Sequence, residues 1–241
     1  MEKLFVPVFL LSIIVLTAAI QPELRLTADD LDMSNIKDVD DRKKRFFDFL
    51  RPVINDENAK ILKLRERLIA AKENNDNKNF VARIARDYSV NWEEGQENWD
   101  KLLERVDAVA VELSLAQSAI ESAWGQSRFA RQGNNFFGQW CYTKGCGLVP
   151  LDRNRNSTHE VASFDSVNDS VRSYIKTINT GRVYALLRKI RQNNRAAEKQ
   201  PDAYAQAAGL VKYSQRREKY VKEIRAIIRE NKKLMLGNYK A

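Results

Sequence analysis

Glycine is concentrated in one stretch of this 241-residue chain, and the regions on both sides of it carry apolar residues at helical spacing. Residues 125–164 hold five of the nine glycines together with Pro150, and their apolar runs are short. Because glycine and proline interrupt helices and short apolar runs suit strands, this stretch predicts loops and a small sheet. The chain is therefore expected to be mainly helical, with one small β element.

The flanking regions predict a series of helices from apolar residues three and four positions apart. A helix is expected at 42–50, and a second one, capped by Asn55 or Asp56, ends before the polar residues 74–79. Further helices are expected at 80–88, near 99–106, and at 167–178, 183–190, 201–211 and 216–233. The pattern contains no internal repeat.

The N-terminus predicts export. Residues 4–20 form an uncharged apolar run that ends in small residues, which is typical of a signal peptide and is also near the lower length of a membrane anchor. Residues 21–41 are polar and acidic and are expected to be a tether. The remainder is then expected in the periplasm or elsewhere outside the cytoplasm, either free or anchored to the inner membrane.

Positive charge gathers at the C-terminal end. The formal net charge is +9, and residues 181–241 alone hold 16 Lys+Arg against 5 Asp+Glu. Such a region could meet nucleic acid, anionic lipid or an acidic wall polymer, or could be a solvated basic face. Nucleic acid is set aside because an exported chain does not meet the genome. Contact with a membrane surface stays open.

Histidine and cysteine are scarce, with one His and two Cys. This excludes a His-rich metal centre and a four-cysteine zinc site, so we expect neither metal nor cofactor. In an oxidising compartment Cys141 and Cys146 can close a short hairpin as a disulfide, and the alternative is a pair of buried free thiols. His159 is expected at most to tune its neighbour Glu160.

The segment 113–125 offers the best candidate for chemistry. It predicts a helix buried on most sides, and Glu121 is the only charge between Glu112 and Arg128. A carboxyl in such surroundings resists ionisation, so its pKa rises, which suits a general acid. The alternative is that Glu121 faces solvent or forms a structural ion pair with Arg128 or Arg131. Downstream, Asn134 and Asn135 stand beside Phe137 and Trp140, residue types that line carbohydrate clefts but also build turns and cores.

These residues carry a resemblance. The run Ala-Gln-Ser-Ala-Ile-Glu-Ser-Ala-Trp-Gly at 116–125, followed by Asn-Asn-Phe-Phe-Gly at 134–138, resembles the signature of the glucosaminidase domain of glycoside hydrolase family 73. The resemblance covers roughly residues 40–235. It implies a mainly α, lysozyme-like fold in which a small β element flanks a groove for glycan strands. It also implies cleavage of the β-1,4 bond after N-acetylglucosamine in peptidoglycan.

The resemblance also implies the site. Glu121 matches the family's catalytic acid, with Ala123 standing where glycine is common, a change expected to be tolerated. Glu160 is the expected second carboxylate, with Asp165 and Asp152 as substitutes; its alternative is a surface strand carboxylate paired with His159. Tyr213 resembles a tyrosine that lines the cleft, and its alternative is a core tyrosine that bonds backbone. The expected substrate-binding residues are Gln117, Trp124, Asn134, Asn135, Phe137 and Trp140.

The expected organisation is a signal or anchor at 1–20, a tether at 21–41, N-terminal helices at 42–75, the glucosaminidase domain at 76–236 and a tail at 237–241. We expect a monomeric endo-β-N-acetylglucosaminidase that acts on peptidoglycan. Lytic transglycosylase chemistry and a non-catalytic peptidoglycan-binding protein are the alternatives.

Overall fold

The computed structural model describes residues 25–153 and 157–237. The predicted signal or anchor, the start of the tether and residues 238–241 of the tail lie outside the described residues. The helices are α1 (Val39–Asn74), α2 (Lys78–Asp87), α3 (Trp99–Arg105), α4 (Val111–Glu121), α5 (Arg128–Gly133), α6 (Val167–Thr180), α7 (Ala185–Ala196), α8 (Ala203–Gln206) and α9 (Glu218–Leu236). Short 3-10 turns are η1 (Ala28–Asp30), η2 (Arg182–Tyr184) and η3 (Ala207–Leu210). The mainly helical prediction is confirmed.

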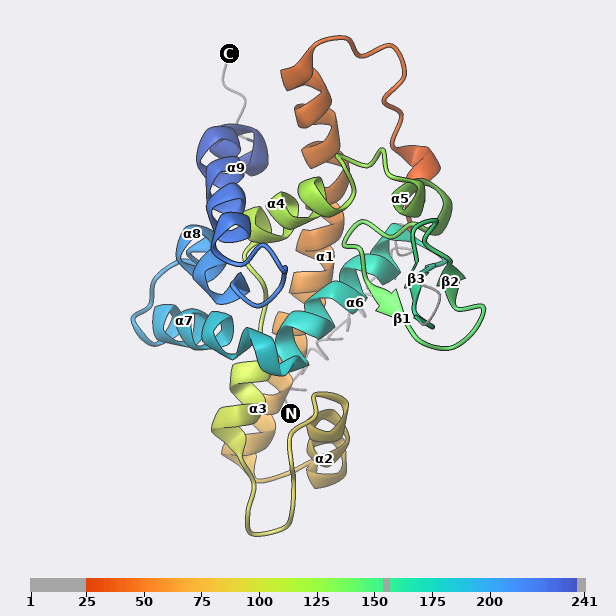
Figure 1. The fold of residues 1–241 in the computed structure, drawn as a ribbon. Coiled ribbons are helices and arrows are strands. Elements are labelled where there is room, and N and C mark those ends of the chain that lie inside the picture. Colours follow the sequence, from red (N-terminus) through yellow and green to blue (C-terminus); the bar gives the residue numbers. More distant parts are fainter. Residues whose placement is uncertain (1–24, 154–156, 238–241) are drawn as a thin grey trace, which may run out of the picture.

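Helix α4 lies at the centre of the molecule, between α1 and α9 (Figure 1). Its residues from Leu113 to Ala119 are all buried, as the small and apolar sequence of this segment predicts. Phe46 and Leu50 of α1, together with Val171 of α6, complete the same core. Helices α2 and α3 form a smaller second core with the C-terminal part of α1. A helix buried on most sides therefore carries the candidate acid.

Helix α1 differs from the two helices expected in this region. It runs unbroken for 36 residues and includes Pro52. A proline inside a helix removes one backbone hydrogen bond, and burial of the neighbouring Leu50, Val53 and Ile54 offsets that loss. Asp38 caps the start, because its side chain accepts hydrogen bonds from the backbone N–H groups of Asp40 and Asp41.

The β element is a three-stranded antiparallel sheet of β1 (Trp140–Cys141), β2 (Gly147–Leu148) and β3 (Glu160–Ala162), in the order β1-β3-β2. A disulfide joins Cys141, the last residue of β1, to Cys146, which directly precedes β2. The small sheet and the disulfide are thus confirmed. With α5, the sheet lies on the side of the molecule opposite α7 and α8 (Figure 1).

The described part of the expected tether is docked on the domain. The backbone N–H of Leu26 donates to Asn168 (3.0 Å), and its carbonyl accepts from the backbone N–H of Val167 (2.7 Å). Leu31 is only 9% exposed. The acidic composition masked these apolar residues, which the sequence interpretation did not weigh. Residues 25–34 are therefore a strap across the domain.

Part of the C-terminal positive charge is internal. Arg188 and Arg191 of α7 are buried, and Arg188 pairs with Glu104 of α3 at 3.0 Å. Arg191 donates to the backbone carbonyls of Asp107 and Ala108, and burial lowers its pKa to about 10, so it stays charged at neutral pH. These two arginines join α7 to α3 and are not available to an external anion. Among the described helices, none is long and apolar enough to cross a membrane.

Candidate active site

Glu121 is the last residue of α4, and its carboxyl is largely enclosed. Burial raises its pKa above the ordinary value of 4.5, against a smaller lowering effect of the hydrogen bond from Tyr220. That bond runs from the Tyr220 hydroxyl of α9 to Oε1 of Glu121 at 2.9 Å. Burial of Glu121 thus favours the protonated carboxyl, which is the property expected of a general acid.

The second oxygen of Glu121 faces the loop after α5. Gly138 has a φ of +63°, and a Cβ at this position would lie 3.4 Å from Oε2 of Glu121. Asn135 holds this loop in place, since its amide donates to the carbonyls of Gln139 (3.0 Å) and Ala162 (2.8 Å). A glycine at this point lets the backbone approach the carboxyl closely.

The chain turns sharply after Glu121. Ala123, Trp124 and Gly125 all have positive φ angles, of 49°, 57° and 78°. The Gly125 N–H donates to the Ser122 hydroxyl at 2.7 Å, and the indole of Trp124 packs edge-on against both Phe46 and Phe47. This turn ends α4 directly at its acid, and the aromatic core of α1 holds it.

Most of the expected substrate-binding side chains are buried or bond to other parts of the protein. Gln117 (0% exposed), Asn135 and Phe137 are buried, and Phe137 stacks on Tyr174 with ring centroids 4.0 Å apart. Asn134 accepts from the backbone N–H of Ala28 in the strap and donates to the Phe164 carbonyl. The prediction that these side chains contact glycan is therefore not supported by their positions. The same is true of Trp124, which packs on the core.

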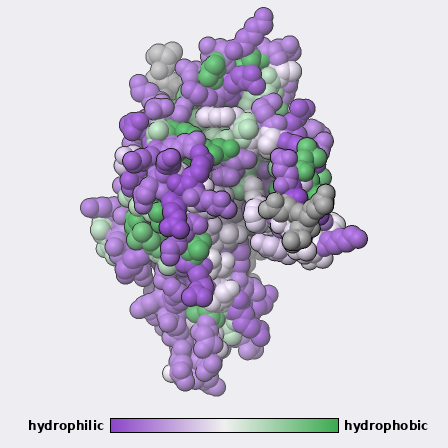
Figure 2. Space-filling model, viewed as in Figure 1, coloured by the Kyte–Doolittle hydropathy of each residue, from purple (hydrophilic) through white to green (hydrophobic). Residues whose placement is uncertain are grey.

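Trp140 is the exception. It is 58% exposed on strand β1, and the imidazole of His159 stacks on it with ring centroids 4.0 Å apart. His159 thus braces an aromatic side chain, which differs from the expected role beside Glu160. On the face drawn in Figure 2 the surface is mostly hydrophilic, and paler residues lie between the helical body and the β element on the right. An exposed, braced indole on the β element can stack on a sugar ring.

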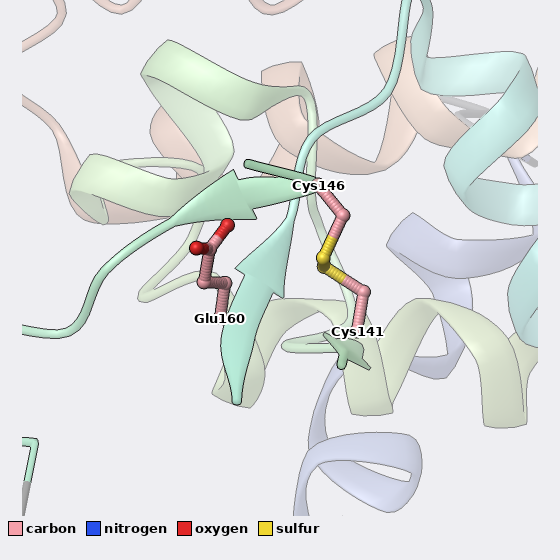
Figure 3. Close-up of side chains that lie close together, drawn as sticks. All are labelled: Cys141, Cys146 and Glu160. Atoms are coloured by element: carbon pink, nitrogen blue, oxygen red, sulfur yellow. A yellow bond between two sulfur atoms is a disulfide. The ribbon is translucent and has the colours of Figure 1, made fainter. Parts of the chain in front are cut away.

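Glu160 is enclosed within the hairpin. Its Oε1 accepts from the backbone N–H of Gly145 (3.0 Å) and its Oε2 from that of Gly147 (2.9 Å). These bonds lower its pKa, so the carboxylate is ionised at neutral pH. Figure 3 shows it beside the disulfide of Cys141 and Cys146. The three side chains form a cluster of potential metal ligands, but the two sulfur atoms are bonded to each other and offer no thiolates. The possible substitutes, Asp152 and Asp165, are exposed.

Tyr213 lies beside Tyr220, the residue that bonds Glu121. Its hydroxyl donates to the Phe137 carbonyl at 2.9 Å, and its ring stacks on Tyr220 with centroids 5.3 Å apart. Of the two roles considered from sequence, backbone bonding is the one these contacts support. Tyr213 ties the loop before α9 to the loop that contains Gly138.

The sequence interpretation missed Tyr220, which directly contacts Glu121. It lies on the buried side of α9 with Val221, Ile224 and Ile228, and the helix expected at 216–233 did not single it out. A phenol on the buried side of a helix needs a partner for its hydroxyl, and this requirement is the one signal that could have singled it out.

Comparison with known proteins matches the part of the chain that contains this site. The family model Glucosaminidase, described as mannosyl-glycoprotein endo-beta-N-acetylglucosaminidase, matches residues 96–233. The chain is 31% identical over 203 residues to Protein bax of Escherichia coli (strain K12), an alignment that covers 82% of this chain and 72% of that protein. No solved structure matches the chain.

Proposed function

This chain belongs to the glucosaminidase family, and from that premise we propose that it is an exported peptidoglycan hydrolase with Glu121 as its general acid. The supporting observation is the environment of Glu121: burial raises its pKa, Tyr220 bonds Oε1, and Oε2 lies toward Gly138. The bond cleaved is the β-1,4 linkage after N-acetylglucosamine. Peptidoglycan glycan strands are the proposed substrate.

In the proposed reaction, protonated Glu121 gives its proton to the glycosidic oxygen as the C1–O bond breaks. The positive charge that develops at C1 is stabilised either by the N-acetyl oxygen of the substrate or by a carboxylate. Water then adds to C1, and one of its protons returns to Glu121. The acid is restored, so one carboxyl can serve both steps.

Glu160 is the proposed carboxylate if a second one takes part. Its ionised state at neutral pH suits the stabilisation of positive charge. Both of its oxygens, however, accept hydrogen bonds from the hairpin backbone, which supports a structural role. That observation favours chemistry with one carboxyl, either N-acetyl assistance or the lytic transglycosylase reaction, in which the substrate's own hydroxyl adds to C1.

Trp140 is the proposed glycan platform, because it is the expected substrate-binding residue that is largely exposed. Export is supported by the apolar run at residues 4–20 and by the disulfide, a bond that persists in oxidising compartments. Exposed lysines of α9, at 219, 222, 232 and 233, support weak attraction to an anionic wall or membrane surface. We expect this attraction to fall with added salt, and we expect the protein to act as a monomer.

Product analysis tests this function. Purified peptidoglycan is digested with wild type, with Glu121→Gln and with Glu112→Gln, a matched control in the first turn of the same helix. We expect new reducing ends at N-acetylglucosamine, by mass spectrometry, from wild type and the control, and a fall of about 10²–10⁴-fold for Glu121→Gln. Anhydro sugars would instead identify transglycosylation. Binding without any cleavage would identify a non-catalytic protein.

A further inference from the structure

We propose that Gln117 is a positioning residue that fixes the Tyr220 hydroxyl as a donor to Oε1 of Glu121 and thereby assigns the catalytic proton to Oε2. The inference rests on the proposed role of Glu121 as general acid. It replaces the expectation that Gln117 binds substrate.

Gln117 lies one helical turn before Glu121 and has no exposed surface. Its amide bridges two tyrosines from different helices. The Tyr174 hydroxyl of α6 donates to the Gln117 carbonyl oxygen at 2.7 Å, and the Gln117 amide nitrogen lies 3.2 Å from the Tyr220 hydroxyl of α9. With the 2.9 Å bond from Tyr220 to Glu121, these groups form one hydrogen-bonded chain that ends at the acid.

The chemistry of the groups sets the direction of this chain. Ionised Glu121 can only accept, so the single hydroxyl proton of Tyr220 must point to Oε1. The oxygen of Tyr220 is then an acceptor toward Gln117, which must present its NH2 group. The carbonyl oxygen of Gln117 consequently faces Tyr174 and accepts its proton. Burial raises the pKa of Tyr174 and of Tyr220, so both phenols keep the protons that this arrangement needs.

The direction decides which carboxyl oxygen can act. A proton on Oε1 would face the Tyr220 hydroxyl inside the protein, where no substrate oxygen can reach it. While Tyr220 donates to Oε1, the proton of the acid resides on Oε2, which lies toward the Gly138 backbone. The bond from Tyr220 also strengthens as Glu121 gains charge during proton transfer, so it stabilises the transition state more than the ground state.

Other titratable groups face this chain. Arg216, just before α9, lowers the pKa of Glu121, while Glu223, which pairs with Arg216, raises it. Tyr213, Tyr174 and Tyr184 of η2 also lie close enough to feel the Glu121 charge. All of these groups stay in place in the Gln117 and Tyr220 variants below, so they shift those pH profiles equally. Tyr174 is replaced only in the additional variant Tyr174→Phe.

A double-mutant cycle tests the proposal, with Gln117→Met, Tyr220→Phe and the double variant. Methionine keeps the length of the side chain without its hydrogen bonds. We expect kcat to fall about tenfold for Gln117→Met and about ten- to hundredfold for Tyr220→Phe, with KM unchanged. The double variant should match Tyr220→Phe, because the amide acts only through the hydroxyl. Additive losses, or a loss that appears in KM, would overturn the proposal.

Gln206→Met is the matched control. Gln206 of α8 is also fully buried, and within the described residues its amide has no hydrogen-bond partner. Its replacement should leave kcat and the pH profile unchanged. If a Gln117 variant does not fold, Tyr174→Phe keeps the test in force, since it removes the far end of the chain. We expect a smaller fall in kcat for Tyr174→Phe, about threefold. An unchanged kcat in this variant would contradict the proposal.

An NMR titration of the Glu121 carboxyl carbon separates this inference from the proposed function. Its pKa should rise in Tyr220→Phe and, less strongly, in Gln117→Met, because each change weakens a bond to the ionised form. This readout needs no turnover. Absence of cleavage by wild type would overturn the proposed function and, with it, the catalytic part of this proposal. An unchanged Glu121 pKa in both variants would overturn the positioning role and leave the proposed function standing.

Discussion

Leu31 packs directly over Gly125, so closely that a Cβ at Gly125 would lie 2.5 Å from Cδ2 of Leu31. The two residues belong to the strap and to the turn that follows the candidate acid. The turn contains three successive residues with positive φ, a conformation that persists only where surrounding structure holds it. The strap is one of the elements that hold it.

Leu31→Ala is therefore expected to destabilise the protein by about 2 kcal/mol, the lower end of the range for a buried leucine. Urea unfolding measures the change. Leu186→Ala is the control, since Leu186 of α7 is 52% exposed and its truncation should cost no more than about 0.5 kcal/mol. Equal effects at both positions would show that the strap does not contribute to the core.

Ala123→Gly is expected to stabilise the protein by about 0.5–1 kcal/mol, because glycine adopts a positive φ without the strain that a Cβ causes. Ala119→Gly, in the helical part of α4, should instead destabilise by about 1 kcal/mol or more. If chemical denaturation shows that the free energy of unfolding rises in Ala123→Gly and falls in Ala119→Gly, the gain at Ala123 comes from its positive φ. Destabilisation by both changes would contradict the strain at Ala123.

Trp140→Ala is expected to raise KM about fivefold, equivalent to roughly 1 kcal/mol of lost stacking, with kcat little changed. Tyr142→Ala provides the comparison, because Tyr142 is 72% exposed on the same hairpin and does not stack on His159. Steady-state kinetics on soluble glycan fragments measure both. An equal rise in KM for the two variants would contradict the proposal that Trp140 is the glycan platform.

The pH dependence of activity and of stability should both report Glu121. Burial raises its folded pKa, so kcat falls as pH rises through that value and the acid loses its proton.

The same shift in the pKa of Glu121 means that its favourable contribution to stability is present below the unfolded pKa, near 4.5, and is lost as pH rises through the folded pKa. Glu121→Gln should consequently be more stable than wild type at pH 7 and equal to it near pH 4. Thermal unfolding at the two pH values checks this.

Glu160 should behave in the opposite way. Its folded pKa is lowered by the backbone bonds, so its contribution to stability is present above the unfolded pKa and is lost as pH falls through the folded value. Glu160→Gln should lower Tm at pH 7 and differ less from wild type at pH 3. If Glu160 is also the second catalytic carboxylate, kcat falls at temperatures where the variant is fully folded. An unchanged kcat at those temperatures would show that Glu160 has only a structural role.

Sequence patterns predicted the helices around the core, the small sheet and the disulfide, because each depends on local periodicity or on a short separation. They also placed Glu121 at the end of a buried helix. They did not predict the partner of Glu121, since Tyr220 is 99 residues away and its place in a helix does not say which group its hydroxyl bonds. The sequence could not separate Trp140, which is exposed, from Asn135, which is buried, because the same residue types that bind sugars also satisfy buried loop backbone, as Asn135 does. Composition alone likewise hid the docking of the strap.

The order of contacts along the strap has a mechanical consequence. A force applied to the chain before Arg25 would first load the 2.6 Å ion pair of Arg25 with Asp169, and next the backbone bonds of Leu26. The bond from Ala28 to Asn134 follows, and Leu31 comes last. Peeling from that end must break these contacts in sequence before it uncovers Gly125. The turn that follows the candidate acid is therefore shielded from tension on the N-terminal side by several contacts in series.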